Sequence, residues 1–222
     1  MTRTPETYWS IPPLWLGETA VIIASGPSLI QQDVDYCRGK ARVIVVNNNY
    51  QVAPWADLHY FADARWYHNY GKSDEYKGKT YVHKEHPLYL AFTGLKVTIK
   101  NNRTVDSHIL NLNNGGSSGL EIENKDTIRT GQNSGYQAIN IATHLGVKRI
   151  LLLGLDMKFM NGKAHHHADH PHQLSEKTIQ NNMLPRFPTL VSPLKKLGIE
   201  VVNCSRSTAI KCFRRSLIQD EI

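Results

Sequence analysis

The chain is punctuated by short apolar segments, each of which stops at a polar or glycine-containing turn. The clearest are residues 19–24, 42–46, 57–61 and 149–153. Runs of four to eight apolar and β-branched residues bounded by turn residues are typical of buried strands. Helix-length segments follow several of these runs, and alternation of strand, turn and helix is typical of a parallel sheet covered by helices. The sequence therefore predicts an α/β fold with a mostly parallel sheet and helices on both faces.

Further elements are predicted between and after these runs. A helix is expected over residues 29–37, with Ser28 placed to cap it. Residues 132–145 are the clearest helical segment, which is expected to bury one face and to stop at Gly146. The other predicted elements are a helix at residues 66–70, strands at 80–83, 95–99 and 200–203, and a helix at 174–197 that Pro185 and Pro188 interrupt.

Residues 1–222 are predicted to form one domain, because this is an ordinary domain length and the pattern shows neither an internal repeat nor a second core. Residues 1–18 are expected to form an irregular N-terminal arm in which Trp9 and Trp15 are packing anchors. Residues 101–125 are polar and rich in Gly, Asn and Ser. A stretch of this kind predicts a flexible loop or a lid.

Charge and composition indicate which kind of ligand the protein binds and in which cellular compartment it is expected. Lys and Arg outnumber Asp and Glu by 26 to 19, and the resulting net charge of +7 favours an anionic ligand. The basic residues are scattered, whereas nucleic-acid binders usually concentrate them on one stripe. No apolar run reaches the ~20 residues of a membrane span, and the polar first ten residues do not resemble a secretory signal. Three cysteines are too few for a disulfide scaffold, so we expect a cytoplasmic protein without a membrane span.

Polar residues follow the predicted strands at the edge of the sheet where open α/β sheets bind ligands. A glycine-containing turn after the first strand suits an anion, and three consecutive asparagines suit the edge of a base or a sugar hydroxyl. Residues 130–135, just before the long helix, again combine hydroxyl and amide side chains with glycine, which suits an anion or a sugar. A tight turn or a helix cap is the alternative explanation. The predicted nucleotide- or donor-binding residues are Ser25, Gly26, Pro27, Ser28, Asn47, Asn48, Asn49, Asp63, Asn133, Ser134 and Gly135.

The sharpest local feature is a histidine tract, residues 163–172, which holds five of the chain's 11 histidines. A neutral imidazole near pH 7 can take a proton from an acceptor hydroxyl, so the tract is a candidate general base. Zinc or another transition metal is the second possible ligand of the tract. The candidate metal ligands are His165, His167, Asp169 and His170. A solvated loop is the third interpretation, although it explains five histidines poorly.

Several motifs, taken in order, resemble one family. They are IIASGPSL at residues 22–29, the strand that ends at Asn47, NSGY at 133–136 and LGVKRILLLGLD at 145–156. Together they resemble the bacterial lipooligosaccharide sialyltransferases, and they are similar also to motility-accessory-factor glycosyltransferases and 6-hydroxymethylpterin diphosphokinase-like proteins. Many phage-encoded proteins share the pattern, including a segment like residues 162–171. The resemblance covers about residues 19–63 and 130–213.

The resemblance implies a Rossmann-like transferase that holds a cytidine-monophosphate sugar. The matching positions are Gly26, Ser28, Asn47, Ser134 and Gly135. A histidine of the family acts as general base without a metal, and its counterpart here would be His167 or His170, oriented by Asp156 or Asp169. The chain departs from the pattern at Ser25, where the sialyltransferases tend to have asparagine, and in the paired tyrosines that contact their phosphate.

The resulting hypothesis is a nucleotide-dependent transferase, specifically a glycosyltransferase with a CMP-type donor and a glycan or nucleic acid as acceptor. No cofactor is required, although Mg²⁺ or Zn²⁺ is compatible with the carboxylates and histidines. One alternative is an ATP- and Mg²⁺-dependent pterin or nucleoside diphosphokinase. The other is a non-enzymatic phage accessory protein that binds nucleotide or nucleic acid. Whether the chain forms a homo-oligomer stays open.

Overall fold

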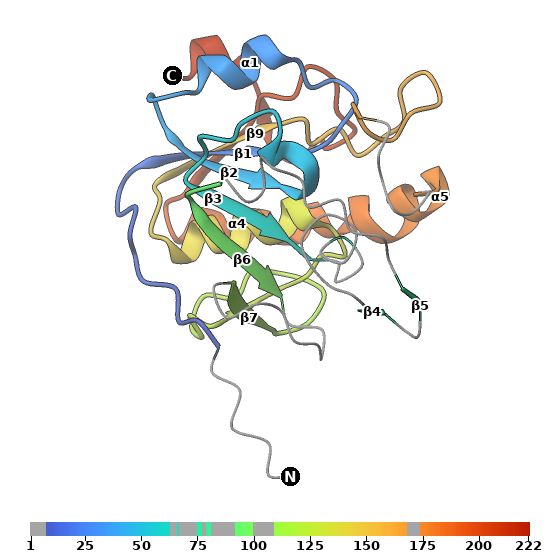
Figure 1. Ribbon diagram of the computed structural model, residues 1–222. Coiled ribbons are helices and arrows are strands. Elements are labelled where there is room, and N and C mark those ends of the chain that lie inside the picture. The colour runs from blue at the N-terminus through green and yellow to red at the C-terminus, as the bar shows by residue number, and fades with distance from the viewer. Residues whose placement is uncertain are drawn as a thin grey trace.

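The computed structural model describes residues 8–62, 66, 75–76, 79–80, 92–99, 109–167 and 174–222. Within these residues the main feature is a sheet of nine strands, ordered β11-β10-β9-β1-β2-β3-β6-β7-β8, in which all pairings are parallel (Figure 1). Its strands are β1 (Thr19–Ile23), β2 (Arg42–Val46), β3 (Leu58–Phe61), β6 (Leu95–Ile99), β7 (Leu110–Asn114), β8 (Thr127–Ile128), β9 (Arg149–Leu153), β10 (Glu200–Asn203) and β11 (Arg214–Arg215). A second, antiparallel pair comprises β4 (Glu75–Tyr76) and β5 (Lys79–Thr80). The predicted Rossmann-like α/β architecture is confirmed.

Helices cover both faces of the sheet because the strand side chains alternate between two apolar clusters. Ala20 and Ile22 of β1 pack in the cluster that contains α4, whereas Val21 and Ile23 pack in the cluster that contains α1. Figure 1 shows α1 above the sheet in this view. The α-helices are α1 (Gln31–Tyr36), α4 (Ser134–His144), α5 (Glu176–Thr178) and α6 (Val191–Lys196). Residues 47–50, 184–190 and 218–220 form 3₁₀ turns, and residues 179–183 form a π turn.

Two helix predictions need correction. Helix α1 begins at Gln31 with Ile30 in the capping position and no side-chain cap, since Ser28 bonds to Asp156 instead. Helix α4 is buried along almost its whole length rather than on one face. The reason is that the segment before α4 also packs against it, and Asn140 accepts hydrogen bonds from the backbone of Glu121 and Arg129.

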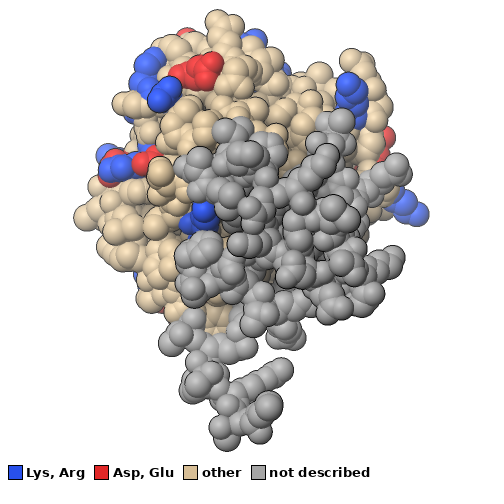
Figure 2. Space-filling model, viewed as in Figure 1, with Lys and Arg blue, Asp and Glu red and all other residues tan. Residues whose placement is uncertain are grey.

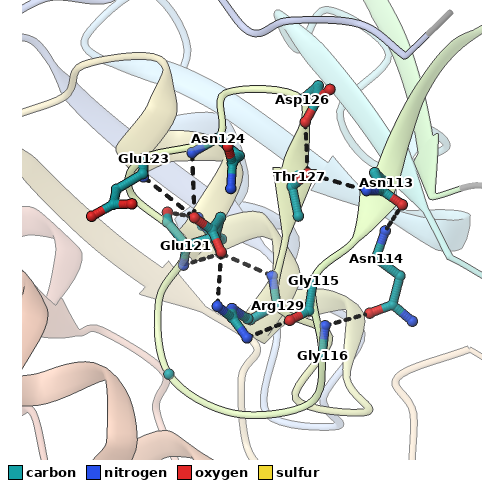
Figure 3. A network of polar contacts seen from close by, with 12 residues as sticks. Asn113, Asn114, Gly115, Gly116, Glu121, Glu123, Asn124, Asp126, Thr127 and Arg129 are labelled. Atoms are coloured by element: carbon teal, nitrogen blue, oxygen red, sulfur yellow. Dashed lines mark hydrogen bonds and ion pairs between the residues drawn. The ribbon is translucent and has the colours of Figure 1, made fainter.

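Residues 101–125 are predicted to form a flexible loop or lid, and the structure corrects this prediction at residues 110–114, whereas residues 115–125 contain neither helix nor strand. Leu110–Asn114 is strand β7, which pairs with β6 and β8. Beyond it the chain is tied down by Glu121, whose carboxylate accepts from the backbone N–H groups of Glu123 and Asn124 and from the Arg129 guanidinium (Figure 3). Polar composition alone therefore gave the wrong answer, because these polar groups bond to one another. Residues 101–108 lie outside the described residues.

The N-terminal arm lies against the sheet edge and α4. Trp9 donates its backbone N–H to Asn111 O at 2.8 Å, and Trp15 donates to Leu145 O at 2.8 Å. Trp15 is buried, and Trp9 is half-buried against the same core. Both tryptophans anchor the arm as predicted, and its described part contains neither helix nor strand.

Candidate functional site

A cavity of about 500 Å³ opens at the carboxyl ends of the central strands. Strand β1 has β2 on one side and β9 on the other, so the connections diverge here, and such a switch point is where open α/β sheets bind ligands. Small-molecule pockets are typically on the order of 300–1,000 Å³. Four polar segments contribute to the lining: Ser25–Gly26 after β1, Asn47 after β2, Gln132–Gly135 before and at the start of α4, and Gly154–Lys158 after β9.

The turn after β1 packs directly on the turn after β9. Gly26 N–H donates to Gly154 O at 2.6 Å, and a Cβ added at Gly26 would lie 2.5 Å from Asp156 Cγ. Only glycine permits this approach. Both Asp156 oxygens accept from Ser28, one from its backbone N–H and one from its hydroxyl, each at 2.6 Å. The Asp156 carboxylate thus holds the Ser25–Ser28 turn in place at the cavity wall.

Backbone strain gathers at this cavity. Among the described residues, four that are not glycine have a positive φ, and three of them line the cavity: Asn47 (52°), Gln132 (56°) and Met157 (51°). Asparagine adopts this left-handed conformation more readily than most residues, whereas methionine does so rarely. Such strain persists where the surrounding structure enforces it, and it clusters at functional sites.

The three consecutive asparagines have three different positions. Asn47 lines the cavity, whereas Asn48 accepts a hydrogen bond from the Trp66 indole N–H at 2.5 Å. Asn49 is fully buried, and its amide nitrogen donates to Ile23 O, Val46 O and Ser25 Oγ. Its oxygen therefore faces His166 Nε2 at 2.8 Å. Asn49 thus acts on the site through His166 and the Ser25 turn.

The described part of the histidine tract folds back onto the end of β1. His166 N–H donates to Ser25 O at 2.9 Å, and burial lowers the pKa of the His166 imidazole. His165 lines the cavity, and its ring stacks on that of His167 at 5.5 Å between centroids, 12° from parallel. The sequence favoured His167 or His170 as a base, but among the described histidines of the tract His165 is the one at the cavity. Asp169 and His170 lie outside the described residues.

Helix α4 points its N-terminus at the cavity. Asn133 caps the helix by accepting from Tyr136 N–H at 3.0 Å, and Ser134 and Gly135 line the cavity beside it. A helix N-terminus favours anions because its first N–H groups lack intrahelical partners. Gln137, one turn further along, is also part of the lining although it is only 4% exposed.

The ionisable groups at the described cavity wall are Asp156, Lys158 and His165. Burial raises the pKa of Asp156, and the two hydrogen bonds from Ser28 oppose that shift. The Asp156 carboxylate is therefore engaged by donors inside the protein, whereas Lys158 contributes a positive charge to the cavity lining. The wall as a whole offers donors and a cation to an anionic ligand.

The predicted binding residues are therefore brought together only in part. Ser25, Gly26, Asn47, Asn133, Ser134, Gly135 and Asp156 share one cavity, Ser28 and Asn49 support it from behind, and Asp63 lies outside the described residues. Sequence reasoning missed that Gln137, Lys158 and Trp66 also line the cavity, whereas Gln132 belongs to the polar segment expected before the long helix. Gln137 carried a usable signal, because it is a polar residue in an otherwise apolar stretch of helix.

A metal site is not visible in the described part of the chain, where no group of three His, Cys, Asp or Glu side chains is close enough to hold an ion. Asp169 and His170, two of the four predicted metal ligands, lie outside the described residues. Basic side chains on the face shown in Figure 2 lie in separate small groups, several of them beside acidic side chains.

Comparison with protein-family models, with curated proteins and with solved structures yields no match. Among the described residues, no helix combines the length and the apolar character that crossing a bilayer requires.

Proposed function

We propose that the protein is a nucleotide-dependent transferase, specifically a glycosyltransferase that uses a CMP-type donor. The observation that carries this proposal is the donor-rich cavity at the switch point of a parallel sheet, next to the N-terminus of α4 and with Lys158 at its wall. The positions that resemble the sialyltransferases support it, since Gly26, Asn47, Ser134 and Gly135 line the same cavity.

In this proposal the N–H groups that begin α4, together with Lys158, bind the phosphate of the donor. His165 takes the proton of the acceptor hydroxyl, and the acceptor oxygen forms the new glycosidic bond while the bond between sugar and phosphate breaks. CMP leaves with the electron pair of that bond. The stacked His167 ring holds His165 in orientation, and Asp156 keeps the Gly26 turn shaped for the donor.

A thermal-shift panel on metal-stripped protein tests the proposal. Its ligands are CMP, CDP, UDP, GDP, ATP with Mg²⁺, and Zn²⁺ alone. A ligand at ~100 times its Kd stabilises the folded state by roughly 2.7 kcal/mol, so binding is visible as a higher Tm. Stabilisation by CMP without metal is expected. Stabilisation by ATP–Mg²⁺ alone would indicate the diphosphokinase instead, and no response to any nucleotide would refute the proposal.

Substitution of the cavity histidine tests the chemical step. His165→Ala should lower transfer by about 10²-fold or more, which is the usual contribution of a general base, and leave the Kd for CMP within about twofold. His167→Ala and His170→Ala, measured in parallel, test the assignment made from the sequence. Equal loss of CMP binding and of transfer in His165→Ala would show that the residue has a structural or metal-binding role.

A further inference from the structure

We propose that Gln137 selects the base of the nucleotide: its side-chain amide donates to the acceptor edge of a cytosine ring, formed by O2 and N3. The inference deepens the proposed function and rests on it. The inference starts from two neighbouring residues: Gln137 on α4 lines the cavity, and Tyr60 on β3 bonds to it from the buried side.

The Gln137 amide has a fixed orientation. The Tyr60 hydroxyl donates to Gln137 Oε1 at 2.7 Å, and Tyr60 is fully buried. Burial raises the pKa of Tyr60, so its phenol stays protonated and remains a donor. Flipping the amide would leave the buried hydroxyl hydrogen without an acceptor, which is unfavourable. The Nε2 amino group of Gln137 therefore faces away from Tyr60.

That amino group is available to a ligand. Gln137 is 4% exposed, and within the described part of the chain its Nε2 group has no hydrogen-bond partner. A nine-tenths buried amide at a cavity wall, with two unused N–H donors, is complementary to an acceptor that enters the cavity. Asn47, at the β2 side of the same cavity, presents a second amide.

The acceptor that fits is neutral rather than anionic. The groups suited to a phosphate, namely the first N–H groups of α4 and the Lys158 ammonium, occur elsewhere on the cavity wall. Gln137 and Tyr60 are both uncharged, and their surroundings are the buried interior of the sheet. Adjacent acceptors at O2 and N3 distinguish cytosine from uracil, whose N3 carries a hydrogen and would oppose the Gln137 donors.

Calorimetric titration of the full chain with CMP, UMP and ribose 5-phosphate tests the assignment. Gln137→Met removes the donors without adding charge, and Tyr60→Phe removes the hydroxyl that orients them. The double variant replaces both buried partners by apolar groups, which keeps the fold testable. Gln51→Met is the matched control, because Gln51 bonds to the hydroxyl of Tyr50 and is not part of the cavity lining.

For the wild type we expect CMP to bind about tenfold more tightly than UMP, as loss of one or two neutral hydrogen bonds implies. Gln137→Met and the double variant should reduce the CMP-to-UMP ratio to about one and leave ribose 5-phosphate binding within about twofold. Tyr60→Phe should reduce the ratio less, and Gln51→Met should leave it unchanged.

The outcomes separate this inference from the proposed function. Equal weakening of CMP and ribose 5-phosphate, or an unchanged CMP-to-UMP ratio, would overturn the role of Gln137 while leaving a nucleotide site intact. A wild-type protein that binds neither nucleotide would overturn both.

Discussion

Two buried carboxylates, Glu121 and Asp156, both lie in loops, and their pKa values shift in opposite directions. Burial opposes ionisation of Glu121, yet the N–H groups of Asn124 and Glu123 and the guanidinium of Arg129 outweigh it and lower the pKa of Glu121 (Figure 3). Among the described residues, the Asp156 carboxylate accepts hydrogen bonds only from Ser28, and burial outweighs these bonds and the charge of Lys158 and raises the pKa of Asp156. The folded structure thus favours the charged form of Glu121 and disfavours the charged form of Asp156 at the cavity.

The difference teaches how to separate scaffold from site when both are rich in Gly, Asn and Ser. In the loop around Glu121, the carboxylate and most of the surrounding donors bond to one another within the protein, although the buried Arg129 Nε has no hydrogen-bond partner among the described residues. At the cavity, the amino group of Gln137 remains open, and three non-glycine residues are held at positive φ. Backbone strain at non-glycine residues therefore marks the site better than loop composition does.

The largest effect is expected at the contact between the β1 and β9 turns. Gly26→Ala places a Cβ 2.4 Å from Gly154 O and 2.5 Å from Asp156 Cγ, so the two turns must separate. We expect a loss of about 3 kcal/mol in the free energy of unfolding, measured by urea titration, together with loss of CMP binding. Gly39→Ala is the control, since a Cβ there meets nothing within 4 Å and only its φ of +72° is unfavourable, at about 1 kcal/mol. Equal losses in the two variants would contradict the close packing.

Glu121→Gln should cause the next largest loss in the free energy of unfolding and should not change ligand binding. The amide cannot accept at both ends, so either the Asn124 and Glu123 N–H groups or Arg129 lose their partner, at a cost of about 2 kcal/mol. Because the pKa of Glu121 is lower in the folded chain, its contribution is present above its ordinary value of 4.5 and is lost as the pH falls. Urea unfolding measured from pH 7 to pH 3 should show that the stability difference between the variant and wild type becomes smaller.

The control is the exposed Glu123→Gln, which should change stability by less than about 0.5 kcal/mol. Weakened CMP binding in Glu121→Gln would count against a purely structural role.

The sheet could be predicted from the sequence because its signal is local. Each central strand is a short apolar run that ends where a glycine or asparagine begins, and β1, β2 and β9 have the predicted bounds to within one residue. Strand β7 could not be predicted, because LNLNN is half polar and lies near the edge of the sheet, where its pairing with β6 and β8 decides its structure.

The candidate site was predictable in outline and not in detail. Residues after the strands were expected to meet, since parallel strands end at one edge, and Gly26, Asn47 and Asp156 do so. What each side chain does depends on contacts between distant segments: Ser28 with Asp156, Asn49 with His166 and Tyr60 with Gln137 are separated by 128, 117 and 77 positions. No local pattern specifies such pairs, which is why Ser28 was taken for a helix cap and Gln137 was overlooked.

Asp156→Asn should change the free energy of unfolding least, and it should stabilise the protein, whereas Glu121→Gln destabilises it. An asparagine can accept from Ser28 N–H and donate to the Ser28 hydroxyl oxygen, so both hydrogen bonds survive. Because the pKa of Asp156 is higher in the folded chain, the unfolded chain loses this proton first, and the free energy of unfolding falls as the pH rises from 3.8 through the folded pKa. The variant escapes that loss, so at pH 7 it should be more stable than wild type by on the order of 1 kcal/mol, and the gain should vanish below pH 3.8. Asp220→Asn, at an exposed position, is the control and should change stability at pH 7 by less than about 0.5 kcal/mol. A destabilised Asp156→Asn at pH 7 would mean that the full negative charge is needed to hold the Gly26 turn, and the contrast between the two carboxylates would then disappear.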